Sequence, residues 1–266
     1  EAWISTFHST CARILRRDIE KLHYTRAFTI YDDDDQSSVI KDVLKQMNLD
    51  EKFLPPRELK AKISDAKNKL QSPDDWFRES AKDFRCQIIQ DAYRLYEEKL
   101  RSANALDFDD LILRTLELFA DHPPVLESYR ERFKYVHVDE YQDTNYAQYM
   151  LVKLITQKSR NLCVVGDDDQ SIYRWRGADI RNILDFEKDY PDAVVIKLEQ
   201  NYRSTANILD AANQVIAHNV GRKEKALWTD EGEGEQIEVF CAGDEREEAA
   251  WICDRVQQLT LAGEDY

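Results

Sequence analysis

Two acidic residues directly follow a short apolar run near the middle of the chain. Residues 136–138 lead into Asp139 and Glu140, and residues 162–165 lead into the polar segment 166–170. A carboxylate at the end of a strand can hold Mg²⁺ and orient a water molecule beside a phosphate while its charge stays hydrated. A single such end is common at ordinary solvated strands. Two neighbouring ends of this kind favour a nucleotide-hydrolysing site.

Aromatic residues alternate with arginines just after the second polar segment, in Tyr173-Arg174-Trp175-Arg176. Rings that stack on bases and guanidinium groups that bind phosphate together bind single strands without reading their sequence. The alternative is a core aromatic flanked by surface arginines. Further along, Tyr202 and Arg203 stand between a predicted strand and a predicted helix. From these residues alone, Arg203 is either a contact to a γ-phosphate or an ordinary partner of a carboxylate.

Strands and helices alternate in the segments that must position these side chains. Apolar or β-branched runs predict strands at residues 3–7, 135–138, 162–165, 194–198 and 236–240. Helical periodicity follows them at residues 9–22, around Leu151 and Ile155, from about Ser204, and through residues 249–259, and it fills residues 31–103. Such alternation predicts a parallel sheet, whose ligands gather at the carboxyl ends of its strands.

Composition limits the remaining classes of function. The 266 residues are 42% hydrophobic, which is enough for a real core, and 37 basic against 52 acidic residues give a net charge of −15. This balance disfavours a broad basic coat for duplex DNA or membranes but leaves room for a narrow basic groove. The five cysteines include no C-x-x-C pair, so a disulfide scaffold or zinc cluster is not expected. Because no apolar run approaches about 18 residues, we expect a cytoplasmic protein without membrane contact.

Five sequence blocks resemble the UvrD/PcrA/Rep family of superfamily 1 DNA helicases, with spacing most similar to the PcrA branch. They are residues 6–9, 106–110, 138–145, 165–179 and 198–208. The resemblance implies an α/β fold: a RecA-like P-loop NTPase motor domain with a parallel sheet, a helical insertion and the start of a second RecA-like domain. The implied boundaries are 1–24 and 106–199 for the first motor domain (1A), 25–105 for the insertion (1B) and 200–266 for the second motor domain (2A).

The resemblance also implies roles for single residues, with ATP and Mg²⁺ as cofactors. Asp139 and Glu140 would hold the metal, and Glu140 would also activate the attacking water. Gln170 would sense the γ-phosphate, Tyr202 would stack on the adenine, and Arg203 would contact the γ-phosphate from the second motor domain. The implied DNA-binding residues are Thr6, Phe7, His8, Phe108, Tyr173, Trp175 and Arg176.

The activity implied is that of an ATP-dependent 3′–5′ DNA helicase and translocase in DNA repair or replication. Its partners would be single-stranded DNA, single/double-strand junctions and accessory replication or repair proteins. The sequence departs from the family pattern because it contains neither G-x-x-x-x-G-K-[ST] nor the later helicase motifs. We therefore expect a fragment that does not hydrolyse ATP alone. The alternatives are the helicase portion of an AddA/RecB-type helicase-nuclease and a non-catalytic nucleic-acid or protein-binding module.

Overall fold

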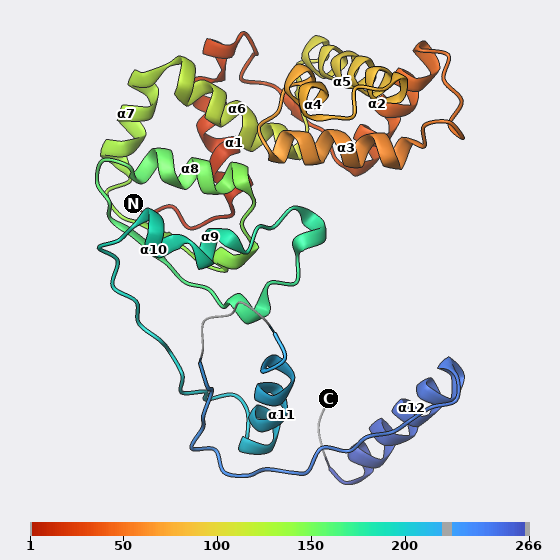
Figure 1. The fold of residues 1–266 in the computed structure, drawn as a ribbon, viewed down its shortest axis with the longest axis vertical. Coiled ribbons are helices and arrows are strands. Elements are labelled where there is room, and N and C mark those ends of the chain that lie inside the picture. The colour runs from red at the N-terminus through yellow and green to blue at the C-terminus, as the bar shows by residue number, and fades with distance from the viewer. Residues whose placement is uncertain (1, 220–224, 264–266) are drawn as a thin grey trace. The chain divides into compact units, whose positions relative to one another are not determined.

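The structure is a computed structural model that describes residues 2–219 and 225–263 (Figure 1). The chain divides into two compact units, Glu1–Ala193 and Val194–Tyr266, and each is described by itself. Within the described part of the chain, no helix combines the length and apolar character needed to cross a lipid bilayer.

One group of helices in the first unit packs around a shared apolar core. Its members are α1 (Phe7–Asp18), α6 (Phe108–Asp121), α7 (Pro123–Arg132) and α8 (Tyr146–Thr156), with the 3₁₀ turn η1 (Ile19–Leu22) after α1. Side-chain caps begin three of these helices. Thr6 accepts a hydrogen bond from the Ser9 N–H, while Asp107 and Asn145 form capping boxes at α6 and α8. The caps fix where the helices start, and the core fixes which face turns inward.

A second group of helices in the same unit has its own core. It consists of α2 (Asp33–Gln46), α3 (Pro56–Asn68), α4 (Pro73–Glu79) and α5 (Phe84–Ser102). Asp32 caps α2 in a capping box with Asp35, so this acidic run starts a helix and complements its dipole. The fully buried side chains of this core include Val43, Leu54 and Leu59.

Two short parallel strand pairs complete the first unit. β1 (Thr29–Ile30) pairs with β2 (Ala105–Leu106), and β3 (Val136–Val138) pairs with β4 (Leu162–Val164). The remaining elements are short: η2 (Tyr141–Asp143), η3 (Asp168–Gln170), η4 (Arg174–Arg176), α9 (Arg181–Leu184) and α10 (Phe186–Asp189). The α/β class and the parallel pairing are as predicted, but the sheets in the described residues are much smaller than the sequence suggested.

The second unit contains two helices, α11 (Ala206–Ile216) and α12 (Glu245–Leu261), in its described residues. An isolated parallel bridge joins Gln200 to Trp228. The Asn207 side-chain amide donates to the backbone oxygens of Gly234 (3.1 Å) and Glu235 (3.2 Å), and this ties α11 to the segment that follows Trp228 in the chain.

Three predicted strands are wrong. Residues 3–5 are irregular and α1 already begins at Phe7, because Thr6 caps a helix instead of continuing an extended run. Residues 194–198 and 236–240 form no strand in the described part of the second unit. Val194, Ile196 and Leu198 are each more than three-quarters exposed. An extended segment needs a hydrogen-bonded neighbour to become a strand, and these apolar residues have none there.

Candidate functional site

The ends of β3 and β4 bring the predicted metal-binding carboxylates, Asp139 and Glu140, beside the segment that leads to Gln170. Val138 lies opposite Val164 in the parallel register. Beyond it, the Val165 N–H donates to the Val138 carbonyl (2.8 Å) and the Tyr141 N–H donates to the Val165 carbonyl (2.9 Å). Asp139 and Glu140 therefore follow β3 directly beside the segment that follows β4, as their positions in the sequence predicted.

Glu140 has an unusual backbone for a residue with a side chain. Its φ of 49° and ψ of 44° lie in the left-handed region, which few residues other than glycine adopt. Such a conformation costs about 1–3 kcal/mol and is frequent at active sites, where the surrounding structure imposes it. The Glu140 N–H donates to the Asp139 carboxylate (2.9 Å), and both side chains are exposed. The turn thus presents two carboxylates to solvent at the strand end.

Gln142, a residue with no predicted role, joins the two strand ends. Its buried amide donates from Nε2 to Glu140 Oε2 (2.8 Å) and accepts at Oε1 from the Asp167 N–H (3.0 Å). Gln170 in turn donates from Nε2 to Asp167 Oδ2 (2.8 Å). A continuous chain of hydrogen bonds therefore runs from Glu140 to Gln170. Two features of the sequence could have predicted this contact: a glutamine two positions after Glu140, and a glycine, Gly166, at the end of the neighbouring strand.

Gly166 leaves the space that Gln142 occupies. A Cβ atom at position 166 would lie 2.6 Å from Gln142 Oε1 and 2.8 Å from Ile183 Cδ1. Real Cβ atoms do not approach other atoms this closely, so any larger residue would displace the amide. Close approach explains why glycine stands here.

Carboxylate oxygens are the donors that Mg²⁺ prefers, and the strand ends supply them. Asp139 and Glu140 offer exposed carboxylates after β3. After β4, the half-buried carboxylates of Asp167, Asp168 and Asp169 have oxygens within 4.8 Å of one another. Exposed acidic groups are common without a metal ion, but this donor set fits Mg²⁺ in its chemistry. Burial, followed by the Glu140 charge, also raises the pKa of nearby Asp143.

Three of the predicted DNA-binding residues meet where α1 and α6 begin. Thr6 caps α1, and the His8 ring lies edge-on to the Phe108 ring with 5.9 Å between their centroids. Phe108 is 49% exposed, and burial lowers the pKa of His8, which favours the neutral imidazole. Phe7 differs from these residues, because its side chain is partly buried against the core.

The other predicted DNA-binding residues follow η3. Tyr173 and Trp175 have ring centroids 6.4 Å apart, and Trp175 is 74% exposed. The Arg176 side chain lies outside the part of the chain that the structure describes. Because η3 contains Gln170, the hydrogen-bonded chain from Glu140 ends three residues before Tyr173. The end of β4 and the two aromatic rings thus lie on one continuous segment of the chain.

Tyr202 and Arg203 belong to the second unit. The Asn201 carboxamide oxygen accepts from the N–H groups of Arg203 (2.9 Å) and Ser204 (2.8 Å), which holds a tight turn just before α11. The Tyr202 hydroxyl donates to Gln200 Oε1 (2.8 Å), and the Tyr202 side chain is 75% exposed. The turn presents an aromatic ring and a guanidinium group to solvent.

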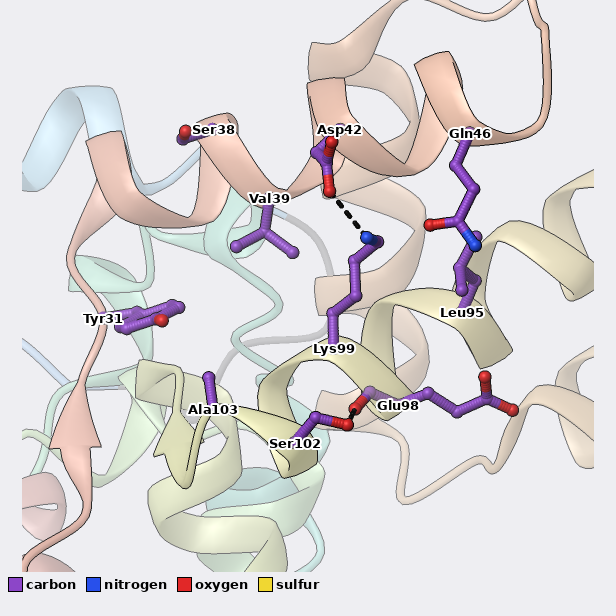
Figure 2. Close-up of a pocket in the computed structure, with 10 residues that line it drawn as sticks. All are labelled: Tyr31, Ser38, Val39, Asp42, Gln46, Leu95, Glu98, Lys99, Ser102 and Ala103. Atoms are coloured by element: carbon purple, nitrogen blue, oxygen red, sulfur yellow. Dashed lines mark hydrogen bonds and ion pairs between the residues drawn. The ribbon is translucent and has the colours of Figure 1, made fainter.

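A separate hollow of about 800 Å³ lies between α2 and α5 (Figure 2). Asp42 and Lys99 form an ion pair across it (2.6 Å), and Val39 and Leu95 supply apolar surface. None of the predicted site residues lines it. The candidate site is therefore at the strand ends and not in this hollow.

Comparison with known proteins decides the family. Residues 1–191 match the UvrD/REP helicase N-terminal domain, and residues 196–266 match the UvrD-like helicase C-terminal domain. The chain belongs to the UvrD/REP helicase family. Proteins named ATP-dependent DNA helicase PcrA from Staphylococcus epidermidis, Bacillus subtilis and Staphylococcus aureus are similar to this UvrD/REP chain. Each is 54% identical to it over 264, 263 and 264 residues, respectively. The matches cover 99% of the chain and 36% of each relative, so the chain spans about a third of the length of these helicases.

Proposed function

We propose that this chain is part of an ATP-dependent 3′–5′ DNA helicase that moves along single-stranded DNA and separates duplexes during repair or replication. The names of the 54%-identical relatives support ATP-dependent helicase activity. The proposal concerns the whole protein that contains the chain. Its substrates would be single-stranded DNA and single/double-strand junctions in the cytoplasm, with accessory replication or repair proteins as partners.

The fold proposed for the whole protein consists of two RecA-like motor domains. Residues 1–24 and 106–199 would belong to the first motor domain (1A), residues 25–105 would form its helical insertion (1B), and residues 200–266 would begin the second (2A). The parallel pairing of β3 with β4, and the carboxylates at their ends, support this assignment for the first motor domain.

The nucleotide would bind at the ends of β3 and β4. Asp139 and Glu140 would hold Mg²⁺, which when bound neutralises charge on the phosphate oxygens. Glu140 would also accept a proton from the attacking water, because its carboxylate is exposed and its turn is held by Gln142. Gln170 would contact the γ-phosphate. In the second unit, the Tyr202 ring would stack on the adenine and Arg203 would approach the γ-phosphate.

Single-stranded DNA would contact exposed rings and the polar groups beside them. The Trp175 and Phe108 rings are exposed enough to stack on bases, and each has an aromatic neighbour. The residues proposed to bind DNA are Thr6, Phe7, His8, Phe108, Tyr173, Trp175 and Arg176.

The observation that carries the proposal is the hydrogen-bonded chain from Glu140 through Gln142 and Asp167 to Gln170. One end is a carboxylate suited to hydrolysis, and the other leads into the segment with Tyr173 and Trp175. A change in the nucleotide at the strand ends would act on the aromatic residues through this chain of hydrogen bonds and the three residues that follow Gln170. This arrangement is what a motor that couples hydrolysis to movement on DNA requires.

The test is ATP hydrolysis by the full-length protein with and without single-stranded DNA, beside its Glu140→Gln variant. We expect strong stimulation by single strands. We expect the variant to retain single-strand binding but to lose hydrolysis, because an amide cannot take the proton from water. Duplexes with a 3′ or a 5′ single-stranded tail would determine the direction of unwinding.

Two results would refute the proposal, and each would favour a different function. Single-strand binding without hydrolysis in the full-length protein would indicate a binding module and leave Asp139, Glu140 and Arg203 without the roles proposed here. Mg²⁺-dependent cleavage of single strands alongside hydrolysis would indicate a helicase-nuclease.

A further inference from the structure

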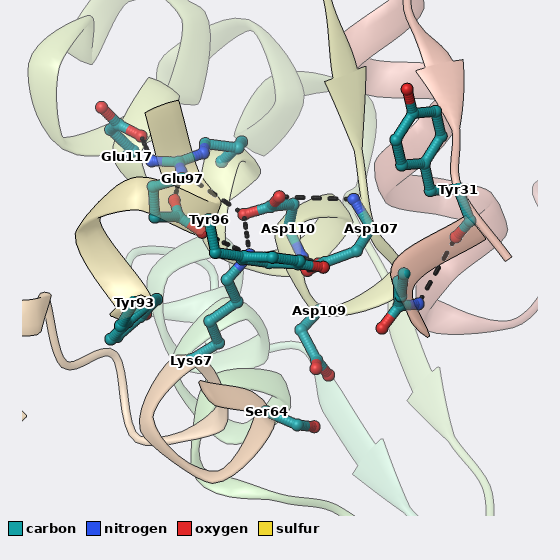
Figure 3. Close-up of polar contacts among 12 residues, drawn as sticks. Tyr31, Ser64, Lys67, Tyr93, Tyr96, Glu97, Asp107, Asp109, Asp110 and Glu117 are labelled. Carbon is teal, nitrogen blue, oxygen red and sulfur yellow. Dashed lines mark hydrogen bonds and ion pairs between the residues drawn. The ribbon is translucent and has the colours of Figure 1, made fainter. Parts of the chain in front are cut away.

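The last turn of α3 carries a buried lysine surrounded by acidic side chains (Figure 3). The Lys67 ammonium group lies 2.7 Å from Glu97, 2.7 Å from Asp107 and 3.0 Å from Asp110, and its side chain is fully buried. Arg114 of α6 forms ion pairs with Glu97 and Asp110. The lysine thus connects α3 and α5 to the start of α6.

The opposite charges in this cluster keep both Lys67 and Asp107 ionised. Burial alone would lower the pKa of Lys67, but the carboxylates of Asp107, Asp110 and Glu97 raise it well above its usual range. Burial raises the pKa of Asp107, and the Lys67 charge outweighs this effect and brings it below its usual value. Asp107 therefore remains ionised, and it caps α6 by accepting the Asp110 N–H (2.8 Å).

The next residue of α3, Asn68, uses both ends of its carboxamide. Its Nδ2 donates to Asp109 Oδ1 (3.0 Å) and to the Ser64 carbonyl (2.8 Å), and its Oδ1 accepts from Asn145 Nδ2. Figure 3 shows the Asp109 side chain directed toward α3, near Ser64. Asn145 is the N-cap of α8, where its Oδ1 accepts the Gln148 N–H (2.9 Å). Asn68 therefore bridges the starts of α6 and α8.

Phe108 lies between the two carboxylates that α3 holds. Asp107 before it is bound by Lys67, and Asp109 after it is bound by Asn68. The Phe108 ring is half exposed, whereas the residues on both sides of it are held by side chains of α3. The carboxamide oxygen of Asn68 accepts from Asn145, which lies five residues after Glu140 in the chain.

We propose that Asn68 is a positioning residue that holds Phe108 in place for single-stranded DNA and joins it to Asn145 at the start of α8. The inference rests on the proposed function, because it takes Phe108 as a DNA contact. Asn68 itself touches neither DNA nor nucleotide in this scheme. It acts through Asp109 on one side and Asn145 on the other.

The test uses Asn68→Asp in the full-length protein, with ATP hydrolysis measured against the concentration of an oligothymidylate. The variant has the same shape and keeps the acceptor for Asn145, but it loses the donor to Asp109 and places two carboxylates together. We expect the half-saturating oligonucleotide concentration to rise about tenfold, while the rate at saturating oligonucleotide stays within about twofold. A general loss of folded protein would lower the maximal rate instead.

The double variant Asn68→Asp, Asp109→Asn exchanges the two side chains and reverses the hydrogen bond, because the amide now at position 109 can donate to the carboxylate now at position 68. It should recover part of the lost affinity for the oligonucleotide, because the hydrogen bond from position 68 to the Ser64 carbonyl stays lost. The matched control is Asn48→Asp. It makes the same charge change at an exposed asparagine just after α2 and should leave the half-saturating concentration unchanged.

Three results would overturn the inference. The first is that Asn68→Asp has the same half-saturating oligonucleotide concentration as the wild type. The second is a fall in the maximal rate alone, and the third is that the double variant recovers none of the lost affinity. The wild-type protein, measured in the same series, shows whether the inference about Asn68 or the proposed function has failed. A wild type without DNA-stimulated hydrolysis would refute the proposed function, and the inference with it.

Discussion

Replacement of Lys67 by methionine should destabilise the region around α3 and α6 strongly. The substitution keeps most of the side-chain volume but removes the positive charge that lies within 3.0 Å of three carboxylates. Arg114 would still pair with Glu97 and Asp110, whereas Asp107, with a side chain only 3% exposed, would lose its cation. Removing one partner from a buried ion pair costs about 3–5 kcal/mol, because the other charge stays buried. We expect a loss of that size at pH 7.5.

The loss should be smaller at pH 5. Burial and the Asp107 charge raise the pKa of Asp110 to about 7, above the value of about 3.9 expected for an unfolded chain. Asp110 therefore stabilises the fold most fully below about pH 4, and this contribution declines as the pH rises through 7. Asp107, with a lowered pKa, contributes stability above about pH 4 that depends on Lys67. At pH 5 a protonated Asp110 leaves one less negative charge for Lys67 to balance.

Hydrogen–deuterium exchange of the full-length protein would measure this effect locally. A loss of about 3–5 kcal/mol corresponds to exchange about 150- to 5,000-fold faster in peptides from α3 and α6, because about 1.4 kcal/mol is a factor of ten. Lys69→Met is the matched control, because Lys69 is exposed just after the same helix and pairs at the surface with Asp65. Its effect should stay within about 0.5 kcal/mol. Equal exchange in Lys67→Met and wild type, or a larger loss at pH 5 than at pH 7.5, would refute the reasoning.

Two further substitutions test the strand ends and the aromatic segment. Gly166→Ala should lower the maximal rate of DNA-stimulated ATP hydrolysis about tenfold, because the new methyl group would displace the Gln142 amide; an unchanged rate would contradict the close approach of that amide. Trp175→Ala should weaken single-strand binding by about 1–3 kcal/mol in a fluorescence anisotropy titration. Tyr135→Ala, at an equally exposed aromatic residue elsewhere in the unit, should not weaken it. Equal affinities for the two variants would remove Trp175 from the DNA contacts.

The sequence predicted the elements whose signal is local. The helices around Leu151 and Ile155 and after Ser204 were recognised from their apolar periodicity, and β3 and β4 from apolar runs that end in acidic residues. The placement of Asp139 and Glu140 beside the segment after β4 followed from parallel pairing. The helices and strands were predicted correctly because each depends on neighbouring residues in the chain. The placement of the two carboxylates depended on the general rule that parallel strands end at the same edge of a sheet.

The failures depend on distant contacts. The run from Trp3 to Phe7 has the composition of a strand, yet Thr6 starts a helix. The Trp3 ring instead packs against two guanidinium groups, whose central carbons lie 4.0 Å (Arg13) and 4.9 Å (Arg132) from the ring centroid. Asn68 and Asn145 are 77 positions apart. No local pattern predicts such a contact, so the bridge they form could not be inferred from the sequence.

The pairing of β1 with β2 has a consequence for how short the connection between them could be. Thr29 lies opposite Ala105, so the chain leaves for α2 and returns from α5 at neighbouring points. Residues 31–104 form this connection. Because β1 and β2 are parallel, a tight turn could not replace them, and a crossover of about a dozen residues would be needed to keep the strands paired. The connection also carries Lys67, which balances the charge of Asp107 and Asp110. A shorter crossover would remove the lysine together with Tyr96 and Glu97 beside it, so water would take the place of the lysine at these carboxylates.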